Sequence, residues 1–294
     1  MRYMNCAYIY LRSLISHIHF RKMFDWIFDL SDADKVYYLS IGMILNAVFV
    51  APILTYLLPA YYGRYTGKYT MAIPANISWI LQESPAFLIP AFCCMGGEVS
   101  HVNQILLGML CLHYFQRSFI YPMLLRTKNP VPISITFFAL LFCTYNGYLQ
   151  GLSLSTGPQY APSTLNSPHF IIGSILFLAG MAGNMHSDSI LRNLRKPGES
   201  GYKIPFGGMF NYVSAANYFC ETIEWTGFAI ACWNLSSGAP IFSVPSFAND
   251  TFLVAFVIYT VSNLFPRALS HHEWYHQKFE NYPKTRKAFI PYLI

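Results

Sequence analysis

The chain has 294 residues, of which 54% are hydrophobic and 17% aromatic, and only 11% carry a charged side chain. A soluble domain rarely has so apolar a composition, so we expect an all-α integral membrane protein, with a soluble protein of two domains as the alternative. The formal net charge of +6 indicates no nucleic-acid partner, because Lys and Arg fall in short clusters between apolar runs.

The first predicted element is an N-terminal segment over residues 1–36. Its stretch LRSLISHIHFRKMFDWIFDL is typical of an amphipathic helix lying in the membrane interface, or of a fragment of an additional span. A cleaved signal peptide is not expected, because His17 and His19 interrupt the apolar stretch. Residues 37–294 are expected to form a single membrane domain.

Apolar runs in this domain predict about seven transmembrane helices, because each run is long enough to cross a hydrocarbon core of roughly 30 Å. The last run should continue as a more polar helix to about Tyr275. The predicted spans are 37–60, 74–96, 103–124, 132–153, 169–190, 209–233 and 248–270.

The loops between these spans differ in charge. The odd-numbered loops and the C-terminal segment carry Lys and Arg, whereas the even-numbered loops, 157–169 and 234–250, carry none. The positive-inside rule therefore places the odd-numbered loops and the C-terminus in the cytosol and the N-terminus in the lumen. N-x-[ST] patterns at Asn234 and Asn249 fall in a loop that this topology assigns to the lumen.

Polar residues recur inside the predicted spans, where a charged side chain costs about 2.5–3.5 kcal/mol at the helix centre. Gln82 and Glu83 stand together in the apolar stretch SWILQESPAFLIP. Helical spacing groups others into three stripes: Asn184, Asp188, Arg192 and Arg195; Asn217 and Glu221; and Arg267, His271 and Tyr275. These stripes predict a polar interior open to the cytosolic side, with an interhelical hydrogen-bond network that binds no ligand as the alternative.

The three arginines in these stripes suit a phosphorylated ligand such as a dinucleotide, because guanidinium groups form paired hydrogen bonds with phosphates. The sequence has no G-x-G-x-x-G motif and no βαβ pattern, so no Rossmann domain is expected. A nucleotide would therefore bind among the helices.

Several motifs resemble the steroid 5α-reductase family. They are LQESPAF (81–87), HYFQRSFIY (113–121), NGYLQG (146–151), the long segment from NMHSDSILRNLR to NYFCETIEW (184–225) and RALSHHEWYHQKFENYPKTRKAFIPYLI (267–294). The resemblance implies a seven-helix enzyme of the endoplasmic reticulum membrane. Such an enzyme holds NADPH between its helices and takes a 3-oxo-Δ4 steroid from the bilayer, adding hydride at C5 and a proton at C4.

The resemblance also implies roles for individual residues. Glu83 and Tyr114 are the catalytic pair that donates hydrogen bonds to the steroid C3 oxygen, and burial favours the protonated, donating form of such a carboxyl group. Gln82 and Trp225 are the expected substrate-binding residues, with a plain core role open for Trp225. The expected NADPH-binding residues are Asn184, Asp188, Arg192, Arg195, Tyr202, Asn217, Glu221, Arg267, His271 and Tyr275.

Three alternatives stay open at this stage. HEWYH, from His272 to His276, matches the H-E-x-x-H pattern of zinc proteases, in which Glu273 would be the general base, but a third ligand is required and no metal is expected. A reductase of the same superfamily acting on a polyprenol or an enoyl-CoA thioester is the second alternative. A sterol-binding protein without enzymatic activity is the third.

Overall fold

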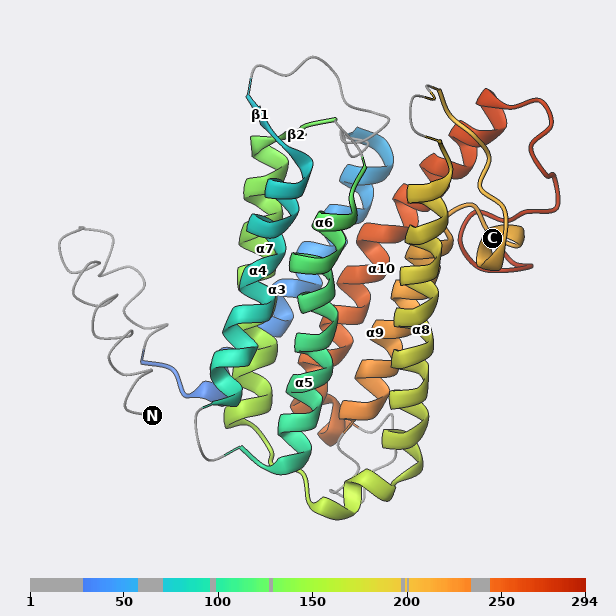
Figure 1. Cartoon of the computed structure of the whole chain (residues 1–294). Helices are drawn as coiled ribbons and strands as arrows, with labels where there is room; N and C mark the ends of the chain where they lie inside the picture. Colours follow the sequence, from blue (N-terminus) through green and yellow to red (C-terminus); the bar gives the residue numbers. More distant parts are fainter. Residues whose placement is uncertain are drawn as a thin grey trace.

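The computed structural model describes residues 29–57, 71–95, 99–126, 129–196, 199, 201–233 and 244–294. Seven long helices of these residues run side by side as a bundle (Figure 1). They are α3 (Asp32–Pro52), α4 (Ala75–Cys94), α5 (His101–Phe115), α7 (Ile133–Thr156), α8 (Pro168–Asn193), α9 (Ala216–Cys232) and α10 (Val244–Lys278). The other described elements are η1 (Ile53–Leu57), β1 (Ala72–Ile73), η3 (Gln116–Ile120), α6 (Tyr121–Leu124), β2 (Val131–Pro132), η4 (Pro162–Asn166) and η5 (Gly208–Asn211).

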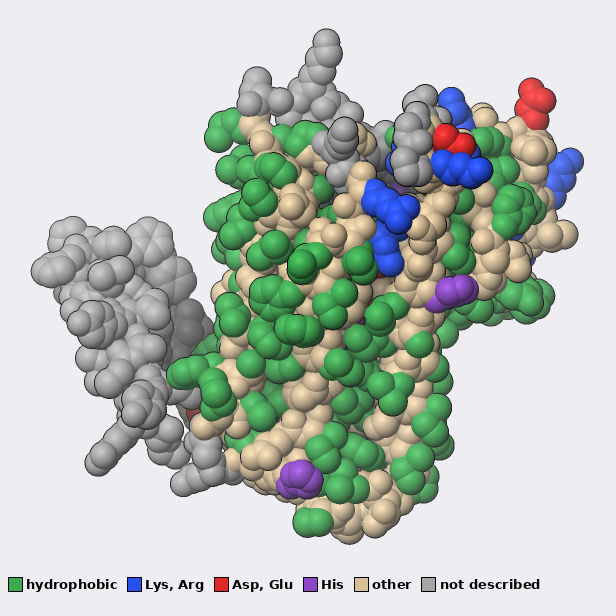
Figure 2. All heavy atoms as spheres, in the orientation of Figure 1, with side chains coloured by type: hydrophobic (Ala, Val, Ile, Leu, Met, Phe, Trp, Pro, Cys, Tyr) green, Lys and Arg blue, Asp and Glu red, His purple; other side chains and the backbone are tan. Residues whose placement is uncertain are grey.

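These seven helices match the seven predicted spans in number and order, so the all-α membrane fold is confirmed. Within the described part of the chain, four helical segments are long and apolar enough to cross a membrane: Asp32–Tyr56, Ala75–Cys94, Pro168–Asn193 and Thr251–Lys278. Large apolar side chains such as Phe49, Phe138 and Ile175 are exposed. Figure 2 shows hydrophobic side chains over much of one face of the bundle. A lipid-facing surface requires such side chains, and the alternative of a soluble protein does not explain them.

Two predicted boundaries are wrong. The first helix begins at Asp32, inside the predicted N-terminal segment, because Ser31 caps it by accepting a hydrogen bond from the Asp34 backbone N–H. The sixth helix begins at Ala216 instead of residue 209, because Gly207 and Gly208 adopt positive φ values of 96° and 51° and the chain then forms the short η5 turn. Most of the N-terminal segment, residues 1–28, lies outside the described residues.

The two short strands, a loop and the C-terminal tail gather at one end of the bundle. β1, β2, the loop 201–215 and the C-terminal tail 279–294 lie at this end, and η4 lies at the opposite one (Figure 1). The tail is joined to the loop by backbone hydrogen bonds from Ser214 N to Lys287 O and from Ala215 N to Ala288 O. Lys and Arg side chains gather at the same end in Figure 2, in agreement with the charge pattern of the odd-numbered loops.

The helix formed by α5 and α6 is interrupted by the π-helical turn η3. Pro122 explains this turn, because a proline has no N–H for the carbonyl of Ser118 and its ring crowds that carbonyl in a regular α-helix. The turn widens the helix between Tyr114 and Tyr121, where the polar interior begins.

Candidate functional site

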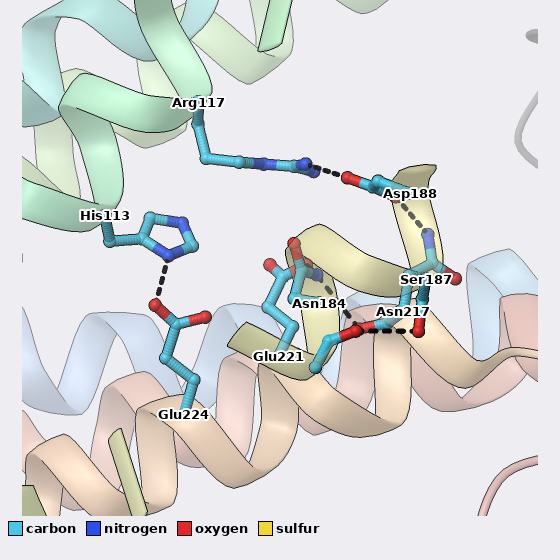
Figure 3. Close-up of polar contacts among 9 residues, drawn as sticks. His113, Arg117, Asn184, Ser187, Asp188, Asn217, Glu221 and Glu224 are labelled. Carbon is cyan, nitrogen blue, oxygen red and sulfur yellow. Dashed lines mark hydrogen bonds and ion pairs between the residues drawn. The ribbon is translucent and has the colours of Figure 1, made fainter. Parts of the chain in front are cut away.

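Polar side chains from several helices meet inside the bundle, towards the end that carries the tail. The last turns of α5 and α8 and the first turns of α9 contribute most of them, and in Figure 3 these side chains point toward one another. The predicted polar stripes of the fifth and sixth spans therefore face one interior region.

Arg117 anchors this region. Its Nη1 donates to Asp188 Oδ2 over 2.8 Å, and both side chains are buried, with exposed fractions of 10% and 3% (Figure 3). The guanidinium also lies 4.9 Å from the ring centroid of Trp79 and 4.6 Å from that of Tyr121. The pair joins α8 to η3, so a charge that is costly in a membrane is neutralised between two elements.

The cofactor-binding residues predicted on α8 and α9 form one hydrogen-bonded cluster. Asn184 Nδ2 donates to Asn217 O at 3.0 Å and to Glu221 Oε2 at 3.4 Å. Asn217 Nδ2 in turn donates to Asp188 Oδ1 at 3.3 Å. The structure therefore brings together four of the ten predicted positions, and it adds Arg117, which was not among the predicted cofactor-binding residues.

Tyr114 and Glu83 approach this cluster from α5 and α4. Tyr114 is 4% exposed, and its Oη accepts a hydrogen bond of 2.9 Å from Asn146 Nδ2. Glu83 is half-buried, and its Oε2 accepts a 3.6 Å contact from Cys143 Sγ. Cys143 and Asn146 are three residues apart on α7, so Glu83 and Tyr114 contact neighbouring turns of the same helix face.

A second buried acid–base pair was missed by the sequence reasoning. His113 Nδ1 lies 2.6 Å from Glu224 Oε1, with side-chain exposures of 5% and 0% (Figure 3). The His113 ring lies 5.0 Å from the Tyr114 ring and 4.4 Å from the Trp225 ring. Glu224 is three residues after Glu221, and this helical spacing was the available signal.

The two predicted substrate-binding residues are both buried. Trp225 is 2% exposed and packs in an aromatic cluster with Tyr114, His113 and Phe256, which supports the core role that the sequence left open. Gln82 is 7% exposed and accepts a long contact of 3.5 Å from Ser78 Oγ. Steroid contact by Gln82 and Trp225 stays a prediction.

The α10 stripe is organised around Tyr218 of α9. Arg267 Nη2 donates to Tyr218 Oη over 2.7 Å, and His271 Nε2 lies 3.4 Å from the same oxygen. Tyr275 is 3% exposed and stacks on Tyr282 of the tail at 5.1 Å. Burial raises the pKa of the Tyr282 hydroxyl above its usual value, so this hydroxyl stays protonated at neutral pH.

The remaining predicted positions lie nearer the surface. Arg192 is half-buried and interacts electrostatically with Tyr121 of α6. Arg195 is exposed, donates to Gly201 O at 3.3 Å and lies 6.0 Å from the Tyr202 ring centroid. Four of the predicted positions on α8 and α9 thus share one hydrogen-bonded cluster, and Arg267 and His271 meet at Tyr218.

The HEWYH segment lies on α10 and in contact with the tail. His272 Nδ1 lies 2.6 Å from Ser214 Oγ, and the His276 ring packs against His272 and Tyr282. Among the described residues there is no group of three or more His, Cys, Asp or Glu side chains that could hold a metal ion. In this part of the chain, the zinc-protease interpretation therefore lacks the third ligand that it requires.

Fold and site together define a helical membrane protein with a buried polar centre near one end of its bundle. A family model described as 3-oxo-5-alpha-steroid 4-dehydrogenase matches residues 129–294. The chain is 44% identical over 252 residues to 3-oxo-5-alpha-steroid 4-dehydrogenase 1 of Bos taurus, a match that covers 83% of this chain and 92% of that protein. It is 41% identical over 242 residues to 3-oxo-5-alpha-steroid 4-dehydrogenase 2 of Homo sapiens, covering 80% of this chain and 89% of that protein. The chain therefore belongs to the 3-oxo-5-alpha-steroid 4-dehydrogenase family.

Proposed function

We propose that this protein is an NADPH-dependent reductase that converts 3-oxo-Δ4 steroids into 5α-steroids. The observation that carries the proposal is the buried cluster of hydrogen-bonded polar side chains on α8 and α9, whose partner Arg117 follows Tyr114 by three residues. Glu83 and Tyr114 contact the same face of α7. The names of the relatives support the same reaction class. The chain would act in the endoplasmic reticulum membrane with its C-terminus in the cytosol, as its loop charges favour.

The chemistry of the polar residues fits NADPH. Arg192, Arg195 and Arg267 provide guanidinium groups for phosphates, and Asn184 and Asn217 provide amides for the nicotinamide or ribose. Asp188, Glu221, Tyr202, His271 and Tyr275 complete the set that the family resemblance suggests. When bound, NADPH supplies the hydride for C5 of the steroid.

The protein's own contribution is to stabilise negative charge on the C3 oxygen. Hydride addition at C5 turns the enone into an enolate, and that charge needs preorganised donors where water is scarce. Tyr114 offers its hydroxyl and Glu83, when protonated, its carboxyl O–H. A proton drawn from solvent then adds at C4 and completes the reaction. Arg117 and Asp188 hold η3 and α8 together.

The proposal is tested with membranes that contain the protein and are supplied separately with testosterone, progesterone and a polyprenol. We expect NADPH oxidation with a steroid and formation of its 5α product, unaffected by added zinc or chelator. NADPH oxidation with the polyprenol but with neither steroid would indicate that the protein belongs to another branch of the superfamily. If no substrate stimulates NADPH oxidation, a sterol-binding protein without enzymatic activity becomes the better interpretation.

Substitutions test the proposed catalytic residues and the proposed NADPH-binding residues separately. Glu83→Leu removes a donor to the C3 oxygen and should lower kcat by about 10²–10³, with NADPH binding retained. Glu83→Gln keeps an N–H donor and should lie between this variant and the wild type. Arg195→Ala should weaken NADPH binding first, whereas Glu280→Leu, at an exposed position of the tail, serves as the control. Normal turnover of Glu83→Leu would refute the catalytic assignment.

A further inference from the structure

A chain of side-chain amides on α7 ends at the Tyr114 hydroxyl. Gln150 Nε2 donates to Asn146 Oδ1 at 3.4 Å, and Asn146 Nδ2 donates to Tyr114 Oη at 2.9 Å. Asn146 and Gln150 are both fully buried. They lie one helical turn apart, so they present their amides on the same face of α7.

The hydrogen bonds in this series all run in one direction, from Gln150 through Asn146 to Tyr114. An amide donates through its nitrogen and accepts through its oxygen. Because Asn146 Oδ1 accepts from Gln150, its Nδ2 faces Tyr114, and the phenol oxygen is the acceptor of that bond. The hydroxyl proton of Tyr114 must then point away from Asn146.

The predicted partner of Tyr114 lies against the same face of α7. Cys143, three residues before Asn146, contacts the Glu83 carboxyl group at 3.6 Å, so Glu83 and Tyr114 meet neighbouring turns of that face. A proton turned away from Asn146 is free for another acceptor, and in the proposed reaction that acceptor is the steroid carbonyl. A phenol that accepts a hydrogen bond is also a stronger donor, because consecutive hydrogen bonds polarise one another.

We propose that Asn146, oriented by Gln150, is a positioning residue that makes Tyr114 a hydrogen-bond donor to the substrate carbonyl. This inference rests on the proposed function, and it gives a role to two residues that neither the family resemblance nor the stripe pattern assigned. A purely structural role, an interhelical bond between α5 and α7, is the competing explanation.

A double-mutant cycle with Tyr114→Phe, measured both in kcat and in the melting temperature, distinguishes the two explanations. Coupling in kcat at an unchanged melting temperature supports positioning, whereas coupling in the melting temperature with none in kcat supports a purely structural bond. Asn146→Leu removes the donor at similar size and should lower kcat about tenfold, with little change in the KM for the steroid. In the Tyr114→Phe background the same substitution should have no further effect on kcat, because Asn146 acts through the hydroxyl that is already absent. Asn146→Asp should lower kcat at least as much, since a carboxylate accepts the Tyr114 proton and turns it away from the substrate.

The controls keep each outcome informative. Thr144→Val changes an exposed position of α7 and should leave kcat and the melting temperature unchanged. If Asn146→Leu fails to fold, Gln150→Met tests the same chain one step further away and should lower kcat about threefold, again only when Tyr114 is present.

The result that would overturn the inference is an equal loss of kcat from Asn146→Leu, or from Gln150→Met, with and without the Tyr114 hydroxyl. Full turnover of Tyr114→Phe alone is a different result. It would refute the catalytic role of Tyr114 and with it the proposed mechanism. The two failures are therefore separable.

Discussion

Gly180 of α8 is where one added methyl group should do the most damage to the site. A Cβ at this position would lie 2.4 Å from Glu224 N, 2.6 Å from Glu224 Cα and 2.7 Å from Cys220 O. All three are backbone atoms of α9, so no side-chain rotation can relieve the contact. Gly180→Ala therefore forces α8 and α9 apart.

The size of the effect follows from these distances. Ordinary van der Waals contact begins at 3.4 Å, so the helices must separate by about 1 Å near Gly180. Overpacking of this kind costs about 1–3 kcal/mol of stability. α8 carries Asn184 and Asp188, and α9 carries Asn217 and Glu221, so the same shift pulls the polar cluster apart. A misplacement of about 1 Å can lower turnover about 100-fold.

The assay compares Gly180→Ala with Gly108→Ala on α5, where a Cβ would meet no atom within 4 Å. Gly108→Ala should raise the free energy of unfolding by about 0.5–1 kcal/mol, because alanine favours the helix. Melting in detergent and steroid-dependent NADPH oxidation are measured for both variants. Equal melting temperatures and equal turnover in the two variants would refute the reasoning about the α8–α9 contact.

Two further predictions concern buried cations. Asp188→Ala leaves the Arg117 guanidinium without its carboxylate and should cost about 3–5 kcal/mol of stability in thermal melting. The double variant Arg117→Met and Asp188→Leu should recover most of that loss, and no recovery would show that the charges were not its cause. Arg286→Ala removes the hydrogen bonds that Nη1 donates to Pro205 O and Tyr282 Oη, at 3.1 and 3.3 Å, and should loosen the loop 201–215 by about 1.5–3 kcal/mol. Limited proteolysis should then cleave that loop faster than in the exposed-site control Lys284→Ala, and unchanged cleavage would contradict the role of Arg286.

The sequence predicts the helices well because the lipid imposes a simple requirement on each of them. An apolar run of sufficient length must become a helix in a membrane, whatever its neighbours are. The start of the sixth helix is one exception, because the apolar residues just before Ala216 belong to a turn that begins at Gly207 and Gly208 and pairs with the C-terminal tail. Hydropathy alone does not distinguish an apolar residue that faces lipid from one that is covered by the C-terminal tail.

Partners across the bundle are the part that the sequence could not predict. Stripe spacing grouped Asn184 with Asp188 and Asn217 with Glu221, because each pair lies on one helix. The Arg117–Asp188 contact instead joins residues 71 positions apart, and the His113–Glu224 contact joins residues 111 positions apart. Such contacts depend on which helices are neighbours and on how each is rotated, and no local pattern contains that information.

The π-helical turn between α5 and α6 makes length itself a constraint on this site. A turn of this kind holds one residue more than a regular helical turn, so removing one residue from Gln116–Ile120 would rotate one flank of the helix by about 100° relative to the other. Tyr114 would keep its place on α5, while Tyr121 and the helix after it would turn to another face. The number of residues separating Tyr114 from Tyr121 is therefore as much a part of the machinery as their identities.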